Sequence, residues 1–206
     1  EAERALLAAL EPWVQAEWEA VANAPQIWGE PDYSLSERMG ARPTLEINGM
    51  GGGFYGPGFK TVLPHKAVAN ISCRLVPDQD PDTILAALQA HIKALAPPTV
   101  EVHFAQDEQR APGILVDRQS APVQAARKAY EVAWGVQPIF SREGGSVPIV
   151  STFQQHMDVP IVLLPFGYKG GGAHGPDEYV PIEMLHKGIT AAITFYNEYG
   201  HMADGD

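Results

Sequence analysis

A histidine in a glycine-rich segment is the residue best suited to chemistry in this sequence. His174 lies within Gly170–Glu178, which follows an apolar run and precedes an expected helix. Loops beyond the ends of sheet strands commonly hold ligands and metals, and glycines let these approach the backbone closely. Metal binding by His174 is one interpretation, and an ordinary surface residue is the other. The local pattern alone leaves both open.

Two further places suit an anionic or carbonyl ligand. Arg142–Pro148 ends an expected strand and opens a helix, where free backbone N–H groups would face a ligand. The alternative is a capped turn with an incidental pair between Arg142 and Glu143. Arg74 lies in an expected strand, and its guanidinium is suited to clamp a carboxylate through two hydrogen bonds. The alternative for Arg74 is an exposed sheet residue.

The run His156-Met157-Asp158 has the His-x-Asp spacing of many metal sites, but its surroundings argue against one. It lies between an expected helix end and the next strand, with no acidic partner pattern nearby. We interpret it as a solvated turn.

The first half of the chain must position Arg74. The prolines at 12, 25, 31 and 43 predict only short helices before Thr44. Alternation then predicts strands over 44–48, 60–64, 69–76 and 100–104, the first two joined by a glycine-rich connection. A helix begins at Pro81, with Asp80 as its N-cap, and ends before the prolines at 97 and 98. This order predicts an α+β unit with an antiparallel sheet and a helix.

The second half of the chain must position His174. Short strands are expected at 114–116 and 161–164, the latter almost wholly apolar. Helices are expected over 121–134, ended by Gly135, near 148–155, and at the C-terminus up to Tyr199. Alternation of helices with a fully apolar strand predicts an α/β layer with both sheet faces covered.

Composition excludes several classes of function. The formal net charge of −11 disfavours nucleic acid, because phosphate binding requires clustered Lys and Arg. The longest apolar run, Val159–Phe166, is too short for a membrane span and contains two prolines. The single Cys73 permits no intrachain disulfide, so we expect a cytoplasmic protein. The chain opens on Glu1 with no signal peptide pattern, which we interpret as a cut inside a longer chain.

Four segments, taken together in chain order, carry a more specific signal than any one of them. They are Gly58–Pro64, Ile71–Pro77, Arg142–Pro148 and Gly172–Glu178. These segments resemble the dimetal peptidase family of carnosinase-like dipeptidases, glutamate carboxypeptidase, acetylornithine deacetylase and succinyl-diaminopimelate desuccinylase. The resemblance runs from about Pro43 to Tyr199 and covers only the C-terminal part of such an enzyme.

The resemblance implies both the fold and the domain boundary. It implies an α+β lid, an antiparallel sheet with a helix, followed by part of an α/β zinc-peptidase-like catalytic domain. Residues 1–107 would be the later part of the lid or dimerisation domain, and residues 108–206 the C-terminal half of the catalytic domain. The partners implied for this chain are a second copy, bound through the lid, and the missing N-terminal half of the same protein.

The resemblance also assigns roles residue by residue. His174 matches a metal-binding histidine. Thr61 and Arg74 match lid residues that touch the substrate, with Arg74 on its C-terminal carboxylate. The substrate-pocket loop is matched by Glu143, Gly145 and Ser146. No catalytic residue is assigned in this chain, because the family's general-base glutamate is expected upstream.

The implied activity is hydrolysis of dipeptides or related small amides with two divalent metal ions. Zinc is the expected metal, with manganese or cobalt as alternatives. In the family a metal-bridging hydroxide attacks the scissile carbonyl. Because a catalytic metal takes three or more protein ligands, we expect the metal to be absent or weakly held here and the isolated chain to be inactive. The competing hypothesis is a non-catalytic dimerisation or peptide-binding module.

Overall fold

The computed structural model describes residues 2–105, 110–144, 147–157 and 159–203. These residues form two compact units. The first comprises Glu1–Ile114 and Ser141–Pro148, and the second Leu115–Phe140 and Ile149–Asp206. The domain boundary between residues 107 and 108 stays a prediction.

The first unit begins with a long helix where only short helices were expected. Helix α1 runs over Ala2–Val21 with Pro12 inside it, so the prediction of short helices was wrong here. A proline inside a helix removes one backbone hydrogen bond, at a cost of about 3 kcal/mol. Buried Leu7 and Leu10, on the helix that contacts α2, offset that cost.

Helix α2, Leu35–Gly40, was missed by the sequence analysis although its signal is present. Ser34 and Glu37 form a capping box, in which each side chain accepts a hydrogen bond from the other residue's backbone N–H. Glu11 of α1 adds two hydrogen bonds, because its carboxylate accepts from the backbone N–H groups of Leu35 and Ser36 at 2.8 and 2.9 Å. A partner on another helix therefore completes the start of α2.

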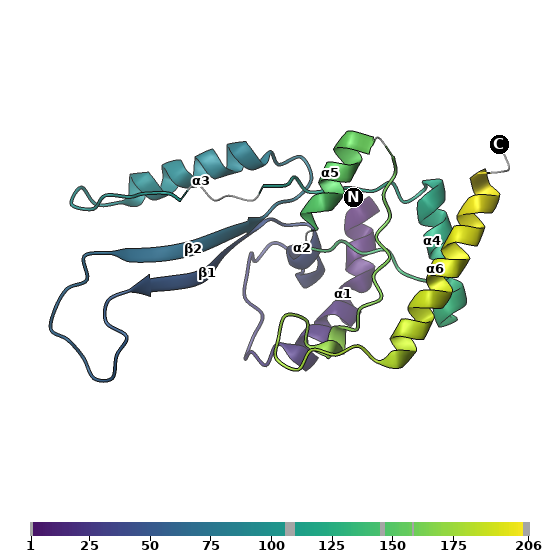
Figure 1. Cartoon of the computed structure of the whole chain (residues 1–206), viewed down its shortest axis with the longest axis horizontal. Coiled ribbons are helices and arrows are strands. Elements are labelled where there is room, and N and C mark those ends of the chain that lie inside the picture. Colours follow the sequence, from purple (N-terminus) through teal and green to yellow (C-terminus); the bar gives the residue numbers. More distant parts are fainter. Residues whose placement is uncertain (1, 106–109, 145–146, 158, 204–206) are drawn as a thin grey trace. The chain divides into compact units, whose positions relative to one another are not determined.

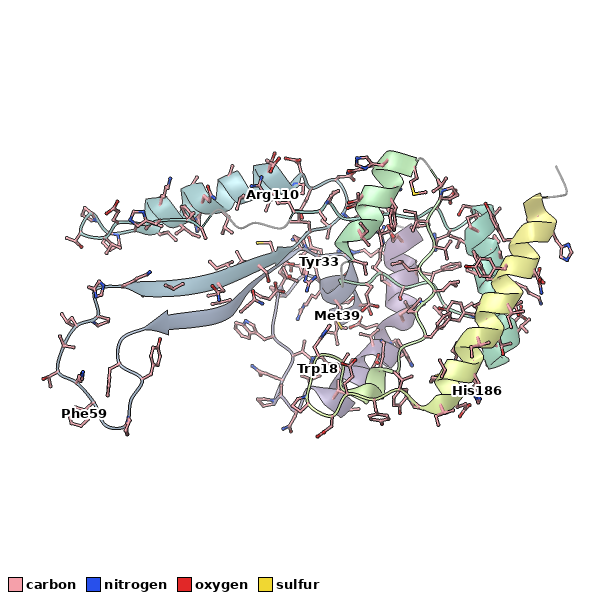
Figure 2. The ribbon with its side chains drawn as sticks, viewed as in Figure 1. Trp18, Tyr33, Met39, Phe59, Arg110 and His186 are labelled. Carbon is pink, nitrogen blue, oxygen red and sulfur yellow. The ribbon has the colours of Figure 1, made fainter. Side chains whose placement is uncertain are left out.

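Strands β1, Thr44–Gly52, and β2, Ala67–Arg74, form an antiparallel two-stranded sheet (Figure 1). The register pairs Thr44 with Arg74 and Ile47 with Ile71, and an irregularity follows Ile47. The strand expected over 69–76 is confirmed as far as Arg74, but its side chains do not alternate between buried and exposed, since Ser72 and Cys73 are both half-buried. The connection over 53–66 loops beyond the end of the strands, and its residue Phe59 is 88% exposed (Figure 2).

Helix α3, Pro81–Leu95, matches the predicted helix with its Asp80 N-cap. The Asp80 carboxylate accepts a hydrogen bond from the backbone N–H of Thr83 at 2.8 Å. Arg110 forms an ion pair with Asp82, which ties the chain after α3 to the start of this helix.

The second unit is built on two helices that pack side by side (Figure 1), α4, Ala121–Trp134, and α6, Ile182–Ala203. Gly135 ends α4 in the left-handed conformation, as predicted. Helix α5, Pro148–Met157, and a short 3-10 helix, η1, Lys169–Gly171, complete the elements.

Four expected strands are not formed among the described residues. These are 60–64, 100–104, 114–116 and 161–164, all in irregular structure. A strand exists only when a neighbour accepts and donates its backbone hydrogen bonds, and alternation or apolarity alone supplies no neighbour. For 161–164 the flanking Pro160 and Pro165 also remove two backbone donors.

Candidate functional site

The loop that carries His174 is shaped by backbone hydrogen bonds within the second unit. The N–H of Gly171 donates to the carbonyl of Tyr168 at 2.9 Å, and the N–H of Tyr179 donates to the carbonyl of Gly171 at 3.0 Å. Inside this closed loop the N–H of Gly175 donates to the carbonyl of Gly172 at 2.8 Å. The chain therefore turns tightly around His174, whose side chain is exposed.

Gly171 is required by close approach, and His174 itself has an unusual backbone. A Cβ at Gly171 would lie 2.2 Å from the carbonyl oxygen of Tyr179, so no other residue fits without moving the loop. His174 has a φ of 64°, in the left-handed region. A non-glycine residue there costs about 1–2 kcal/mol, and such strain concentrates at functional sites. The backbone of His174 is thus held in a conformation that few residues other than glycine adopt.

The segment before this loop is fixed to both main helices of the second unit. Tyr130 of α4 donates its hydroxyl hydrogen to the carbonyl of Pro165 at 2.8 Å, and burial raises the pKa of Tyr130 to about 12. The ring of Phe166 lies against Gly188 of α6, where an added Cβ would come within 2.8 Å of the ring. These contacts join the segment before the His174 loop to α4 and α6.

The loop that contains Glu143 is held by the helices of the first unit. Arg142 donates from Nε to the Glu3 carboxylate of α1 at 2.6 Å. Gly40 at the end of α2 has no room for a side chain, because its Cβ would lie 2.5 Å from the carbonyl oxygen of Arg142. Gly144 similarly approaches the carbonyl of Met39. Arg142 thus pairs with Glu3, whereas the capped-turn alternative paired it with its neighbour Glu143.

Arg74 and Thr61 lie in different parts of the sheet region. Arg74 is the last residue of β2 and pairs in register with Thr44, with its side chain exposed. Thr61 lies in the connection between the strands and is also exposed. Both side chains are exposed, and their contact with a substrate stays a prediction.

Two residues beside Arg74 were missed by the sequence analysis. Thr44 and Glu46 share the polar face of the sheet with Ser72 and Arg74, because Thr44 pairs with Arg74 and Glu46 with Ser72. Thr44 Oγ1 and Glu46 Oε2 are buried side-chain oxygens with no hydrogen-bond partner among the described atoms. Their position could have been found from the alternation of residues 44–48 against residues 70–74, once the register was known.

The predicted site residues divide between the two units. Thr61, Arg74 and Glu143 belong to the first unit and His174 to the second. Gly145 and Ser146 lie outside the described residues. The described residues of the predicted site therefore lie on separate segments, and their common site stays a prediction.

A metal site is not complete within the described part of the chain. No three His, Cys, Asp or Glu side chains gather there in an arrangement that would hold a metal ion. His156 lies in the last turn of α5, where its Nδ1 is 2.9 Å from the carbonyl oxygen of Thr152, and Asp158 lies outside the described residues. It is helical, not in the turn that we expected. The described residues thus offer His174 as a single imidazole donor.

The comparisons with known proteins now identify the family. Residues 6–100 match the peptidase dimerisation domain family of M20 peptidases. Over 203 residues, 96% of this chain, the sequence is 32% identical to the Cys-Gly metallodipeptidase of Saccharomyces cerevisiae. The chain belongs to the M20 metallopeptidase family. It is also 28% identical, over 78% of its length, to the human Beta-Ala-His dipeptidase.

Solved structures of M20 peptidases and of a related dipeptidase have the same fold as this chain. The dipeptidase Dug1p of Saccharomyces cerevisiae superposes with a TM-score of 0.78 and 28% identity over 98% of this chain. A metallo-carboxypeptidase from Sulfolobus solfataricus gives a TM-score of 0.77 at 22% identity over 97% of the chain. The predicted fold class, an α+β lid followed by part of an α/β zinc-peptidase-like catalytic domain, is confirmed.

The M20 relatives are longer than this chain. The chain spans 42% of the yeast dipeptidase sequence and 32% of the human one. Within the described residues, no helix has both the length and the apolar content to cross a membrane.

Proposed function

We propose that this chain is the C-terminal part of a metal-dependent dipeptidase whose intact form hydrolyses the peptide bond of dipeptides. The observation that carries the proposal is the 32% identity to a Cys-Gly metallodipeptidase, which extends over 96% of this chain but only 42% of that relative. The activity therefore belongs to the intact protein, for which we also propose a cytoplasmic location.

The residues of this chain have distinct roles in the proposal. His174 supplies one imidazole ligand to a divalent metal, held ready by the loop that Gly171 closes. The other ligands and the general base come from the rest of the intact protein. Because His174 is a single donor, the isolated chain has no catalytic metal site and is inactive. Zinc, manganese and cobalt all accept an imidazole ligand, so the metal is chosen by residues outside this chain.

Substrate binding is assigned to the first unit. Arg74 holds the C-terminal carboxylate of a dipeptide through its guanidinium, and Thr61 contacts the substrate from the connection between the strands. Glu143, Gly145 and Ser146 line the pocket. The match of residues 6–100 to the dimerisation domain supports a homodimer through this unit.

The test is dipeptide hydrolysis by the intact protein with added Zn²⁺, Mn²⁺ or Co²⁺. Cys-Gly is the probe because the yeast relative is named for it. We expect His174→Ala to lower activity by more than about 100-fold, since replacing a residue that only hydrogen-bonds to a metal ligand already costs about 10- to 100-fold. His186→Ala, which removes an exposed histidine of α6, is the matched control and should leave activity unchanged. Full activity in His174→Ala, or none in the intact protein with any of the three metals, would overturn the proposal and leave a peptide-binding or dimerisation module.

The role of Arg74 has its own test in the same assay. Arg74→Lys keeps the charge but loses the two-pronged contact, so we expect KM to rise about 10-fold with little change in kcat. A dipeptide with an amidated C-terminus should show no such difference between the two proteins. Equal effects on both substrates would contradict carboxylate binding by Arg74.

A further inference from the structure

Two tyrosine rings lie together at the base of the loop that carries His174. Tyr168 precedes the loop and Tyr179 follows it, and their ring centroids are 5.9 Å apart, with the ring planes tilted by 55°. Aromatic rings at this separation and tilt attract each other. The two rings, here called the tyrosine pair, therefore join the two ends of the loop.

The backbone of the loop closes at the same two residues. The carbonyl of Tyr168 accepts a hydrogen bond from Gly171 at 2.9 Å, and the N–H of Tyr179 donates to the carbonyl of Gly171 at 3.0 Å. The Tyr168 ring also covers Gly170, where an added Cβ would come within 2.7 Å of the ring. Gly171 is buried, whereas residues 172–180 are all exposed. Contacts to the loop are therefore concentrated at its base.

The loop needs such contacts, because its sequence does not favour its conformation. Glycines at 170, 171, 172 and 175 give this backbone a wide choice of conformations. His174 and Asp177 nevertheless both have left-handed backbones, with φ of 64° and 60°. Residues other than glycine keep such a conformation only where the surrounding structure imposes it. Since the side chains around His174 are exposed, that structure is the base of the loop.

The exposure of the tyrosine pair indicates a local role. Tyr168 is 41% exposed and Tyr179 55% exposed, whereas rings that only fill a hydrophobic core are normally buried. We propose that Tyr168 and Tyr179 are positioning residues: their rings hold the loop closed and so preorganise the His174 imidazole for the metal ion. This inference rests on the proposed metal-binding role of His174, and it places neither tyrosine on the metal.

The first test measures opening of the loop in the intact protein without metal. Tyr168→Ala removes one ring, so hydrogen exchange in residues 168–179 should become about 2- to 10-fold faster, the range that one aromatic pair supplies. Tyr168→Phe keeps the ring and should stay within about 2-fold of the unmodified protein. Unchanged exchange in α4 and α6 shows that the variants are folded.

Phe153→Ala is the matched control for removal of a ring. Phe153 lies on α5 in the same unit and is 47% exposed, close to the value for Tyr168. This variant should leave exchange in residues 168–179 unchanged. Faster exchange there in Phe153→Ala than in Tyr168→Ala would overturn the inference.

A double variant tests whether the two rings act together. Tyr179→Ala should have the same effect as Tyr168→Ala, because either change removes the same ring contact. The protein with both changes should then exchange about as fast as either single variant. Effects that multiply in the double variant would show two independent contacts and overturn the pair.

The second test measures Zn²⁺ affinity of the intact protein by competition with a coloured chelator. An open loop does not present His174, and apparent affinity falls in proportion to the closed fraction, so Tyr168→Ala should bind Zn²⁺ about 2- to 10-fold more weakly. Tyr168→Phe and Phe153→Ala should bind it as the unmodified protein does. Unchanged affinity in Tyr168→Ala, or equal weakening in Tyr168→Phe, would overturn the inference.

Hydrolysis of Cys-Gly separates positioning of His174 from contact with the substrate. In Tyr168→Ala the rate should fall at limiting Zn²⁺ and return at saturating Zn²⁺, with KM unchanged. A KM that stays raised at saturating Zn²⁺ would instead assign the ring to the substrate and overturn the positioning role.

The outcomes also separate this inference from the proposed activity. If His174→Ala binds Zn²⁺ as tightly as the unmodified protein, the metal-binding role of His174 fails and the inference fails with it. If Zn²⁺ binding depends on His174 and on the Tyr168 ring but no dipeptide is hydrolysed, the activity is wrong and the positioning role stands. If Cys-Gly is hydrolysed through His174 while Tyr168→Ala changes neither exchange nor affinity, only the positioning role is wrong.

Discussion

The α1–α2 pair and the α4–α6 pair are held together by different forces. Between α1 and α2, polar contacts accompany a small apolar contact: Glu11 accepts hydrogen bonds from Ser36, both from its backbone N–H and from its hydroxyl, and Arg4 pairs with Glu37. The hydroxyl of Ser36 lies 2.6 Å from Glu11 Oε2. Much of this contact therefore depends on ionised carboxylates.

The α4–α6 pair relies on close packing of small residues. Ala125, Ala129 and Ala191 are all fully buried. The ion pairs here lie within single helices, Lys128 with Glu131 in α4 and Lys187 with Glu183 in α6. The comparison indicates that the first pair responds to charge and pH, and the second to side-chain volume.

The largest expected effect is on the packed pair. Ala191→Phe inserts a ring where Ala191 is fully buried, and such overpacking costs about 3 kcal/mol of the free energy of unfolding. Hydrogen exchange measured peptide by peptide should show faster exchange in α4 and α6 and unchanged exchange in α1 and α2. Thr190→Phe, at the neighbouring exposed position, is the control and should cost less than about 0.5 kcal/mol. Equal loss from both variants would contradict close packing as the main force.

A smaller effect is expected from the polar pair. Glu11→Gln replaces the carboxylate that accepts from Leu35 and Ser36, and should cost about 2 kcal/mol because hydrogen bonds to charged groups are stronger. Glu19→Gln in the same helix is the control, since Glu19 accepts only from the exposed side chain of Gln15 among the described contacts. Chemical denaturation of both variants measures the difference. A Glu11→Gln protein as stable as Glu19→Gln would remove the distinction between the two pairs.

Lowering the pH should destabilise the α1–α2 pair more than the α4–α6 pair. Burial acts to raise the pKa of Glu11, but hydrogen bonds from Ser36 and Leu35 outweigh burial and hold the pKa below its ordinary value of 4.5. The backbone hydrogen bond from Ser34, and then Arg4, lower the pKa of Glu37. A lowered pKa in the folded state contributes stability that is present above pH 4.5 and is lost as the pH falls below it.

The measurement is hydrogen exchange at pH 6 and below about pH 4, corrected for the intrinsic pH dependence of exchange. Protection should fall in α1 and α2 before it falls in α4 and α6. The Lys187 side chain lowers the pKa of Glu183 in α6, but that pair lies within one exposed turn and does not join the helices. Earlier loss of protection in α4 and α6 would reverse the assignment of forces.

Local signals explain which parts of the fold were predictable from sequence. The cap at Asp80, the stop at Gly135 and the helical spacing of α3 and α4 are each contained within a few neighbouring residues, so their elements were predicted correctly. The length of helix α1 was predicted wrongly. Pro12 is a local signal for a helix end, but the helix continues through it, and its leucines at 7 and 10 are buried. The prediction of a strand at 161–164 was wrong, because a strand needs a second strand to pair with its backbone, and no local pattern supplies one.

The candidate site also combines features that local sequence predicts with features that depend on distant contacts. His174 and its glycines were found from sequence, but the strained φ of His174 and the contact between Gly171 and Tyr179 depend on a fold that local pattern does not specify. The partner of Arg142 could not be predicted from sequence either, since Glu3 lies 139 positions earlier in the chain. Roles that depend on the rest of the protein stay predictions.

The smallest expected effect concerns the base of the His174 loop. Tyr130→Phe keeps the ring of α4 but removes the hydrogen bond from its hydroxyl to the carbonyl of Pro165, at a cost of about 1 kcal/mol. Exchange should rise in residues 161–179 while α1 and α2 stay unchanged, because the hydroxyl joins α4 to that segment alone among the described contacts. Tyr196→Phe is the control, since the Tyr196 side chain is 74% exposed. If Tyr130→Phe leaves exchange in residues 161–179 unchanged, the loop is held by packing alone, and the α4–α6 unit needs no polar contact to position His174.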